Sequence, residues 1–259
     1  MSMTSMATVA AAAIYLIGAA SADEGWYATL SGGTDMPTGG DVQKDMSSSV
    51  LNLGTLNPAL EGTGGSLTFN RTSWRDVYGD APLVNFELGY NWSKALTGYA
   101  RLGYVWDSSR SFLAGTADIP ALGGAQDIYG KYSDYNSWLL TIGGRYTFNT
   151  ESALKPYLGA DIGAAFVKEI DATYTIPTAG IIVSDARLTD RTTAFTGGIE
   201  AGLLYDVAPN VQVGGSVGLR YVGGLDGGST DLSGLGIAAT PDAGHRLSVP
   251  LTISLSAKF

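Results

Sequence analysis

The chain has 259 residues, of which 36 are glycine, 10% are aromatic and only 15% are charged, a composition that fits an all-β protein better than one with a highly charged soluble surface. It contains no cysteine, which excludes disulfide frameworks and thiolate metal centres. The formal net charge of −9 argues against nucleic-acid binding, because that function needs a basic face.

The chain begins with an apolar run, residues 7–19, followed by Ala20, Ser21 and Ala22, which have the small-residue pattern of a signal-peptide cleavage site. The run is too short to cross a bilayer as a helix. We therefore expect residues 1–22 to be a signal peptide and residues 23–259 to form one transmembrane β-barrel domain. Residues 1–6 lack Lys and Arg, a departure from the usual basic start that leaves the true start codon open.

Eight later segments alternate apolar and polar residues, which is the pattern of a β-strand with one apolar and one polar face. The last segment is the clearest, with apolar residues at odd positions from Leu247 to Phe259 and polar residues at most even positions. Pro250 interrupts it, and we expect a bulge there because proline cannot donate to a β-ladder. In chain order the segments are about 25–33, 82–92, 96–106, 138–148, 158–167, 195–205, 211–221 and 245–259.

The connections between these segments are alternately long and short. Long connections cover about 34–81, 108–132, 169–190 and 223–244, and short ones cover 93–95, 150–154 and 206–210. A soluble sandwich has no reason to place all long loops at one end, whereas outer-membrane barrels have short periplasmic turns and long external loops. We therefore predict an eight-stranded antiparallel up-and-down transmembrane β-barrel with four long external loops and three short periplasmic turns. Pairing of the last strand with the first would leave no free edge.

Aromatic residues on the apolar face give an independent indication, because they fall near the two ends of the segments. Interfacial aromatic girdles of a membrane barrel have this distribution. Along the fourth segment, Trp138 precedes Tyr146 and Phe148 by eight and ten residues, which in a tilted strand spans roughly 20–25 Å, about the height of an outer-membrane apolar band. The predicted periplasmic girdle comprises Trp26, Tyr90, Trp92, Tyr146, Phe148, Tyr205 and Phe259, and the external girdle comprises Tyr104, Trp106, Trp138, Phe166, Phe195 and Tyr221.

The polar face, which would line the lumen, carries three acids and three bases that balance to zero. They are Glu87, Arg101, Arg145, Asp161, Glu200 and Arg220. An eight-stranded barrel is only wide enough for its side chains to fill it, and buried ions must pair. We interpret these residues as a charge-paired plug near mid-height, with Glu87–Arg101, Arg145–Asp161 and Glu200–Arg220 as neighbours. A gated polar path for small solutes or ions is the alternative.

The sequence does not favour a catalytic site. The single histidine, His245, could in principle join Ser248 in a hydrolytic site, but alternation puts the two on opposite faces of one strand. We expect no catalytic residues, no metal site and no cofactor. The long loops are polar and mostly acidic, which we interpret as solvated surface; bridging to lipopolysaccharide phosphates through divalent cations is the alternative.

Four stretches carry a resemblance to a known family: EGWYATLSGG (24–33), NFELGYNW (85–92), YARLGYVW (99–106) and LTISLSAKF (251–259). With the alanine-rich cleavage site, they resemble the opacity-type or OmpA-like eight-stranded outer-membrane barrels, which include alphaproteobacterial surface antigens of the porin family. The resemblance implies insertion by the barrel-assembly machinery, for which Phe259 would be the assembly signal. It also implies roles in envelope integrity, adhesion or slow solute diffusion, among outer-membrane lipids and lipopolysaccharide. No peptidoglycan-binding domain follows Phe259, so we do not expect wall anchoring.

These observations lead to one expected function and two alternatives. We expect an exported, integral outer-membrane protein with a structural or surface-interaction role in the Gram-negative envelope and a largely plugged lumen. A narrow passive pore for small solutes or ions is the alternative, and a lipid-modifying enzyme is the less favoured one.

Overall fold

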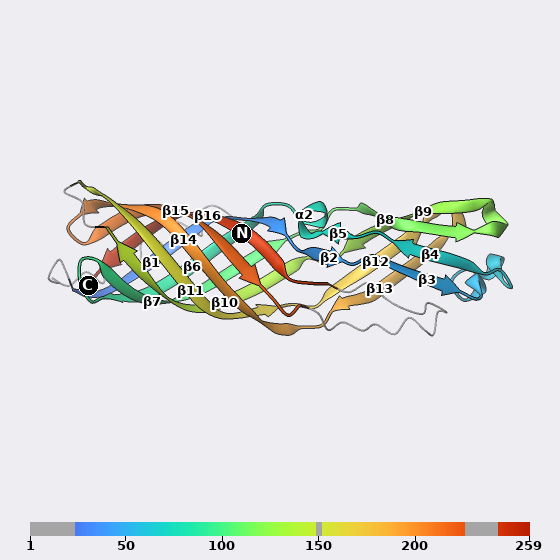
Figure 1. Ribbon diagram of the computed structural model, residues 1–259, viewed down its shortest axis with the longest axis horizontal. Coiled ribbons are helices and arrows are strands. Elements are labelled where there is room, and N and C mark those ends of the chain that lie inside the picture. Colours follow the sequence, from blue (N-terminus) through green and yellow to red (C-terminus); the bar gives the residue numbers. More distant parts are fainter. Residues whose placement is uncertain (1–23, 149–151, 226–242) are drawn as a thin grey trace, which may run out of the picture.

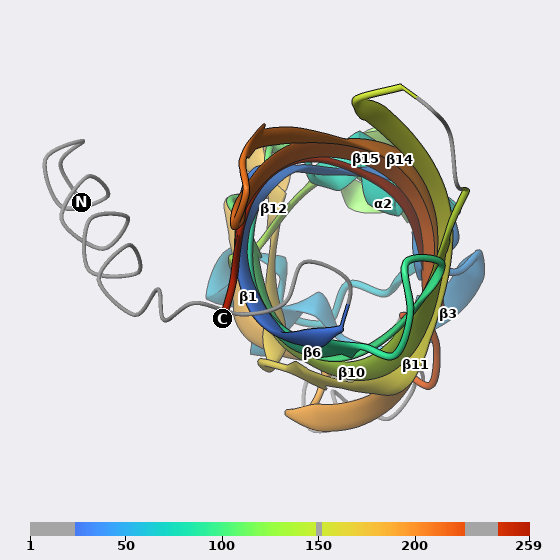
Figure 2. The same ribbon diagram turned by 90° about the vertical axis from the view of Figure 1, so that its left-hand side faces the viewer.

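The computed structural model describes residues 24–148, 152–225 and 243–259, so the expected signal peptide, part of one short turn and most of the last long loop lie outside the described residues. Eight of the described strands close into an antiparallel barrel in the order β1-β16-β15-β14-β11-β10-β7-β6 (Figure 2). Their bounds are β1 Gly25–Gly39, β6 Ala81–Asn91, β7 Leu96–Asp107, β10 Tyr135–Thr147, β11 Leu154–Val167, β14 Thr192–Ala208, β15 Val211–Val222 and β16 Arg246–Lys258. The predicted barrel is confirmed.

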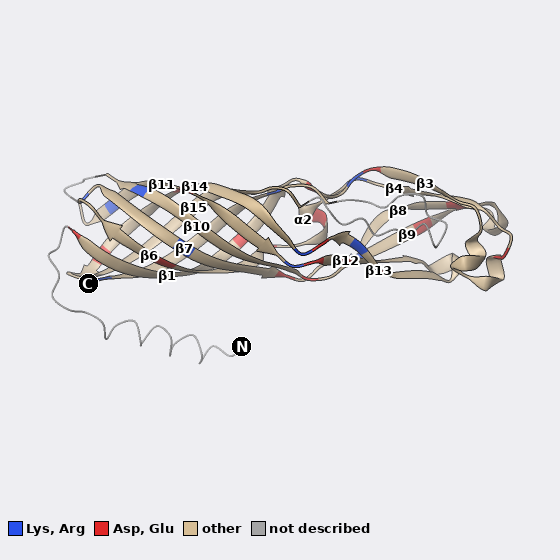
Figure 3. Ribbon diagram, turned by 90° about the horizontal axis from the view of Figure 1, so that it is seen from below, with Lys and Arg blue, Asp and Glu red and all other residues tan. Residues whose placement is uncertain are grey.

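The outer wall of the barrel is apolar, as the alternation in the sequence requires. Ile142 and Ile253 expose 64% and 76% of their surface on this wall, and most other large apolar side chains of the strands are also exposed. A soluble protein would bury such side chains, whereas a lipid-facing wall leaves them uncovered. Charged positions are few along the barrel ribbon (Figure 3). Within the described residues, no helix has the length and apolarity needed to span a bilayer.

Several barrel strands are longer than their sequence patterns indicate. β1 continues to Gly39 rather than ending at Gly33, and β14 has 17 residues and runs through Asp206 to Ala208. Glycine, proline and aspartate lower the local preference for strand in these parts. β1 pairs with β16 and β6, and β14 pairs with β11 and β15. This pairing overrides the low local preference for strand.

The bulge predicted at Pro250 is wrong. Opposite β1, one register runs unbroken from Lys258 to Ser248, with Asp35 facing Pro250. Opposite β15, the pairs Val217–Leu251 and Arg220–Ser248 share one register, and only the ladder between them is interrupted. Gly218 leaves room for the proline ring, since a Cβ at this position would lie 3.2 Å from Pro250 Cγ. Proline has no N–H to donate, so the hydrogen bonds of the ladder are interrupted at Pro250, but the register does not shift.

The seam between the first and last strands closes the barrel. The amide of Phe259 donates to the carbonyl of Trp26 over 2.9 Å. At Gly33 the two backbones approach so closely that an added Cβ would lie 1.9 Å from the Leu251 carbonyl oxygen. Only glycine fits this approach without a backbone shift.

The first three long connections form a second β-structure rather than the solvated loops that we expected. A six-stranded sheet has the order β13-β12-β9-β8-β4-β3 and continues the barrel along its long axis (Figure 1). Its strands are β3 Met46–Val50, β4 Gly65–Phe69, β8 Phe112–Ile119, β9 Gly124–Tyr132, β12 Ile170–Ile176 and β13 Ile181–Thr189. With it go β2 Asp41–Gln43, β5 Thr72–Ser73, α2 Trp74–Val77 and the short 3₁₀ turns η2 Leu53–Thr55, η3 Pro58–Leu60, η4 Pro120–Leu122 and η5 Pro177–Ala179. We call these elements together the extension.

The extension has its own apolar core, which explains why it is ordered. On β12, Ile170, Ala172, Tyr174 and Ile176 are buried, and the residues between them are half-buried. They pack in one cluster with residues from all five other strands of the sheet, including Leu67 on β4. Burial of this area contributes the hydrophobic stabilisation that isolated polar loops lack.

Candidate functional site

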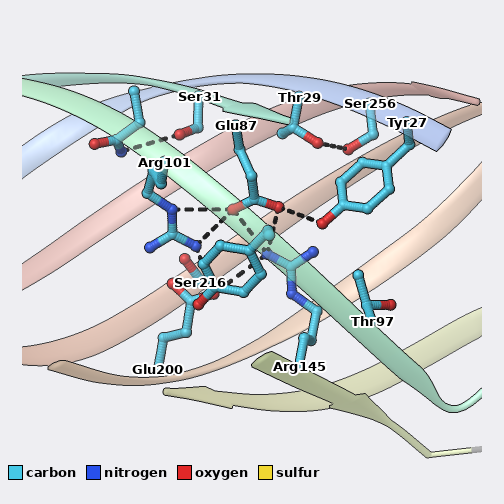
Figure 4. A network of polar contacts seen from close by, with 12 residues as sticks. Tyr27, Thr29, Ser31, Glu87, Thr97, Arg101, Arg145, Glu200, Ser216 and Ser256 are labelled. Atoms are coloured by element: carbon cyan, nitrogen blue, oxygen red, sulfur yellow. Dashed lines mark hydrogen bonds and ion pairs between the residues drawn. The ribbon is translucent and has the colours of Figure 1, made fainter. Parts of the chain in front are cut away.

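All six predicted lumen charges meet in one network inside the barrel, which we call the six-charge network. Arg101 is its centre. It contacts Glu87 (Nη2–Oε2, 2.8 Å), Glu200 (Nη2–Oε1, 2.9 Å) and Asp161 (Nη1–Oδ2, 3.0 Å). Figure 4 shows Arg101 between Glu87 and Glu200. One guanidinium therefore joins carboxylates from three different strands.

Two further arginines complete the network. Arg145 Nη2 lies 3.1 Å from Glu87 Oε1 and 3.3 Å from Glu200 Oε1. Arg220 Nη2 lies 3.4 Å from Asp161 Oδ2. The side chains of all six residues are 13% exposed or less, so these charges are held away from bulk water.

One of the three predicted ion pairs forms, and the other two do not. Glu87 does face Arg101 directly across β6 and β7. The predicted pairs Arg145–Asp161 and Glu200–Arg220 do not form ion contacts; instead, Arg145 contacts Glu200 and Asp161 contacts Arg220. These partners lie two strands apart.

Glycine explains this choice of partner. Gly159 lies opposite both Arg145 and Glu200, and Gly198 lies opposite both Asp161 and Arg220. Because glycine has no side chain, the lumen beside it is open. The acid and the base on the two neighbouring strands meet in that space. A Cβ at Gly159 would lie 3.0 Å from Glu200 Cγ. We call these two arrangements the glycine-spaced rows.

Three tyrosines support the network, and the sequence analysis assigned them no role. The Tyr27 hydroxyl donates to Glu87 Oε1 over 2.7 Å. The guanidinium carbon of Arg101 lies 4.7 Å from the ring centre of Tyr99, and that of Arg145 lies 4.6 Å from the ring centre of Tyr157. Such cation–π contacts stabilise cations that are out of water. The signal was available for Tyr99 and Tyr157, which share the parity of Arg101 and Asp161 on their strands, but not for Tyr27, because residues 25–33 carry no charge.

The lumen is closed at the network. The cavity that remains among these side chains has a volume of about 30 Å³, which is room for roughly two or three water molecules. Arg145 Nε, Asp161 Oδ1 and Arg220 Nε are buried without a hydrogen-bond partner among the described residues. This space holds about two or three waters and is too small for an ion with its full hydration shell.

A second closure lies where the barrel meets the extension, and the sequence analysis missed it. Arg246 Nη1 contacts Asp35 Oδ2 at 2.5 Å, both side chains being fully buried, and its guanidinium lies 4.9 Å from the ring centre of Tyr135. Trp74 and Tyr78 pack on Tyr135. We call Trp74, Tyr78 and Tyr135 the aromatic barrier. It went unnoticed because Asp35, Trp74 and Tyr78 all fall in the segment that we predicted as loop.

The aromatic barrier is fixed to the barrel by hydrogen bonds. Trp74 Nε1 donates to the His245 carbonyl over 3.0 Å, and the Tyr78 hydroxyl donates to the Ser133 carbonyl over 2.8 Å. Burial raises the pKa of the Tyr78 hydroxyl above its usual range, so it stays a neutral donor. The short helix α2 thus holds an apolar layer over the lumen.

The thirteen predicted girdle residues lie on the outer wall. Apart from Phe259, ten of the other twelve are exposed, and Tyr90 and Tyr104 are half-buried. Neighbours within each girdle touch. In the periplasmic set, the ring centres of Trp26 and Tyr90 are 5.4 Å apart. In the external set, those of Tyr104 and Trp138 are 4.6 Å apart. Phe259, 39% exposed, ends the closing strand.

His245 and Ser248 point to different environments. The His245 ring stacks on Tyr221, an outer-wall residue, with ring centres 5.6 Å apart. Ser248 is fully buried, and its hydroxyl lies 3.3 Å from Arg246 Nη1. A nucleophile and its base must be within hydrogen-bond reach, and this pair is not arranged in that way.

The closed barrel, its apolar wall and its aromatic ends define an eight-stranded barrel of the outer-membrane class. Residues 122–240 match the model of the opacity family porin proteins. These residues are similar to that family, and the match, together with the closed barrel, indicates an outer-membrane location.

Solved outer-membrane structures are similar to the chain at low identity. Neisserial surface protein A is 15% identical, with 93% of this chain and 100% of that chain covered and a TM-score of 0.43. The outer membrane protein OprG from Pseudomonas aeruginosa is 15% identical, with 91% and 96% covered and a TM-score of 0.38. Ail, the attachment invasion locus protein of Yersinia pestis, is 10% identical, with 92% and 98% covered and a TM-score of 0.39. No curated protein matches the sequence.

Proposed function

We propose that this protein has a structural or surface-interaction role in the Gram-negative outer membrane and does not conduct solutes. The six-charge network is the observation that carries the proposal, because it leaves only about 30 Å³ at mid-lumen. The aromatic barrier adds an apolar layer on the external side of the network. Neither closure is a loop that could swing away, since both are built from strand residues and a helix hydrogen-bonded to the barrel.

The extension supports the surface-interaction part of the proposal. It presents an ordered sheet with its own core beyond the end of the barrel, on the side of the long connections (Figure 1). An ordered surface binds a partner with a smaller entropic penalty than flexible loops do. We propose no catalytic role, because His245 and Ser248 face apart. Residues 1–22, which lie outside the described residues, are proposed to direct export.

A planar-bilayer measurement tests the proposal. Refolded protein, added without other porins, should give no single-channel steps at voltages at which a general porin conducts. Regular conductance steps from the wild-type protein would contradict it and would favour the alternative of a narrow passive pore for small solutes.

We also propose outer-membrane lipids and lipopolysaccharide as neighbours of the external girdle. A cleft of about 480 Å³ lies there, with Tyr104, Trp138 and Phe166 as its aromatic lining and with Lys168 and Arg191 beside them. Aromatic rings suit acyl chains near the interface, and cations suit phosphates. Substitution of Lys168 and Arg191 by Gln should weaken co-purification of lipopolysaccharide; unchanged lipid content would contradict this neighbour.

A further inference from the structure

Large apolar side chains form a line across four strands on the outer face of the extension. Leu113 on β8 faces Tyr129 on β9. Thr175 on β12 faces Tyr129 on one side and Ile182 on β13 on the other. Leu113, Tyr129 and Ile182 expose 50%, 44% and 66% of their surface. We call these four residues the apolar strip.

The extension does not need the apolar strip for its own core. Ile128 and Tyr174, which are the chain neighbours of Tyr129 and Thr175, point the other way and are buried. Two residues farther from the barrel along β9, the outer face carries the exposed Asp127. Exposed apolar side chains that lie in line on an otherwise polar face mark a surface that packs on a partner.

The charge around and beyond the apolar strip is acidic. Residues 46–70, 112–130 and 170–186 contain no Lys or Arg. The acids in these ranges are Glu61, Asp118, Asp127, Asp171 and Asp185. Figure 3 shows that the cations of the extension lie near its barrel end.

Two of these acids are open to a partner beside the strip. Asp127 and Asp185 are exposed and form no ion pair among the described residues. Asp127 Oδ2 accepts only a long hydrogen bond, 3.4 Å, from the Tyr129 hydroxyl. Toward the barrel, Lys131 is the first cation on β9, and Arg187 on β13 is already held by two aspartates.

These charges exclude several occupants of the apolar strip. Exposed carboxylates repel the phosphates of lipids and nucleic acids. A second copy in the same membrane would bring its own Asp127 and Asp185 to the same height, and like charges that face each other oppose association. A cationic partner meets charge of the opposite sign.

The spacing of the strip fits an α-helix that lies across the strands. Neighbouring strands are about 4.8 Å apart, so Tyr129 lies about 4.8 Å from Leu113 and about 9.6 Å from Ile182 across the sheet. Helix residues three and seven positions apart are separated by about 4.5 and 10.5 Å along the axis and lie on one face. A helix with apolar side chains at this spacing places one of them on each large residue of the strip.

We propose that the apolar strip binds a basic amphipathic α-helix of a partner protein. The apolar face of the helix packs on Leu113, Tyr129 and Ile182, and its Lys and Arg side chains lie near Asp127 and Asp185. Tyr129 is the expected anchor, because tyrosine is enriched among the residues that contribute most to binding. The inference rests on the surface-interaction role proposed above and names the chemistry of the partner.

A designed peptide is the probe for the test. It is an amphipathic helix of roughly 18 residues with leucine on one face and lysine on the other, and its counterpart has glutamate in place of lysine. The protein in phosphatidylcholine nanodiscs is titrated into fluorescent peptide, and the anisotropy is compared with that of empty nanodiscs. The test variant is Tyr129→Thr with Ile182→Thr, because threonine suits a strand. The matched control is Leu51→Thr with Leu122→Thr, which removes two apolar side chains exposed elsewhere on the extension.

The wild type and the control should bind the lysine peptide saturably and should not bind the glutamate peptide. The test variant should bind at least about tenfold more weakly, because loss of an anchor residue changes affinity by about a factor of ten or more. Asp127→Asn with Asp185→Asn should also weaken binding and should reduce its dependence on salt.

Two results would overturn the proposal. One is no binding of the lysine peptide above the level of empty nanodiscs, and the other is equal binding to the wild type and the test variant. Gel migration before and after boiling shows which variants fold. If the test variant does not fold, Ile182→Thr alone, on the edge strand β13, replaces it with the same expected direction. The conductance measurement does not involve the peptide, so failure of either test leaves the other result intact.

Discussion

At the scale of single residues, the lumen depends on buried charges that are compensated only by one another. Arg145 holds Glu87 and Glu200 together from β10, and both acids are nearly excluded from water. Removal of one member of a buried ion cluster leaves an uncompensated charge, which is far less favourable than loss of a surface pair.

We therefore expect Arg145→Ala to lower the free energy of unfolding by about 3–5 kcal/mol. Denaturant unfolding in detergent measures this change. Arg191→Ala is the control, because its pair with Glu169 is exposed and should contribute less than about 1 kcal/mol. The double variant with Glu200→Ala should recover part of the loss. If water enters the gap, Arg145→Ala should also give conductance steps; no change in either stability or conductance would refute the plug.

A pair of tyrosines in the extension leads to a prediction about pH. Tyr132 and Tyr174 donate to Gln43 Oε1 over 2.7 and 3.1 Å, inside the apolar core. Burial raises the pKa of both hydroxyls well above the usual value near 10. Because the folded pKa exceeds the unfolded one, this contribution to stability is complete below about pH 10 and decreases as the pH rises further.

The extension should therefore loosen above about pH 10, and tyrosinate absorbance should appear together with protease sensitivity of residues 112–132. Replacement of both residues by Phe removes the titrating groups, so the double variant should lose this alkaline transition. A transition that is unchanged in the double variant would show that other groups cause it.

The sequence predicted which charges lie in the lumen, but not which of them pair. Parity alone placed six charges in the lumen, because side-chain direction alternates along a strand whatever its partners are. The choice of partners depended on the registers that bring Gly159 and Gly198 between acid and base, and no pattern in one strand contains that information. We did not predict the contact of Asp35 with Arg246, because Asp35 lies in the part of β1 that we predicted as loop.

At the scale of the strands, closure of β1 on β16 depends on a single glycine. A side chain at Gly33 would meet the backbone at Leu251, whereas a Cβ at the neighbouring Gly32 would lie 3.9 Å from its nearest atom, the Leu83 carbonyl oxygen. These two residues form a matched pair for a test.

We expect Gly33→Ala to destabilise the barrel by about 1–3 kcal/mol through a forced backbone shift. Gly32→Ala should have almost no effect. Thermal unfolding of the two variants measures the difference, and equal midpoints would show that the seam relaxes without loss of stability.

The last strand gives a second test at this scale. Phe259 fixes the end of β16 because its backbone N–H donates a hydrogen bond to the Trp26 carbonyl. Deletion of Phe259 should reduce the amount of assembled protein in the membrane and leave a protease-sensitive periplasmic form. Deletion variants that accumulate folded protein at wild-type levels would contradict a role for this residue in assembly.

Elements were predictable where alternation was long and uninterrupted, and not elsewhere. The barrel strands have that alternation. In the extension, bulges change the parity within β8, between Leu113 and Gly115, and within β13, opposite Ala172 and Tyr174, and glycine and aspartate lower the β-propensity. The buried positions of β12 were nevertheless readable from residue 170 to 176. A search for short alternating runs inside the loops would have found them.

At the scale of the whole molecule, an apolar outer wall predicts how the purified protein behaves. The mature protein should need detergent to stay in solution, and it should migrate differently on gels before and after boiling, because the closed barrel resists detergent at low temperature. Circular dichroism should indicate mainly β-structure. A mature protein that is monomeric in plain buffer would contradict a membrane barrel.

The glycine-spaced rows have a consequence for assembly. A slip of one residue between β10 and β11 would turn one set of lumen charges toward lipid and one set of isoleucines toward the lumen. A slip of two residues would keep the faces but would move Gly159 out of the gap between Arg145 and Glu200. The ionic contacts thus act as an alignment key, because a barrel with misaligned strands would lose the ion pairs that Arg101, Arg145 and Arg220 make in the observed register.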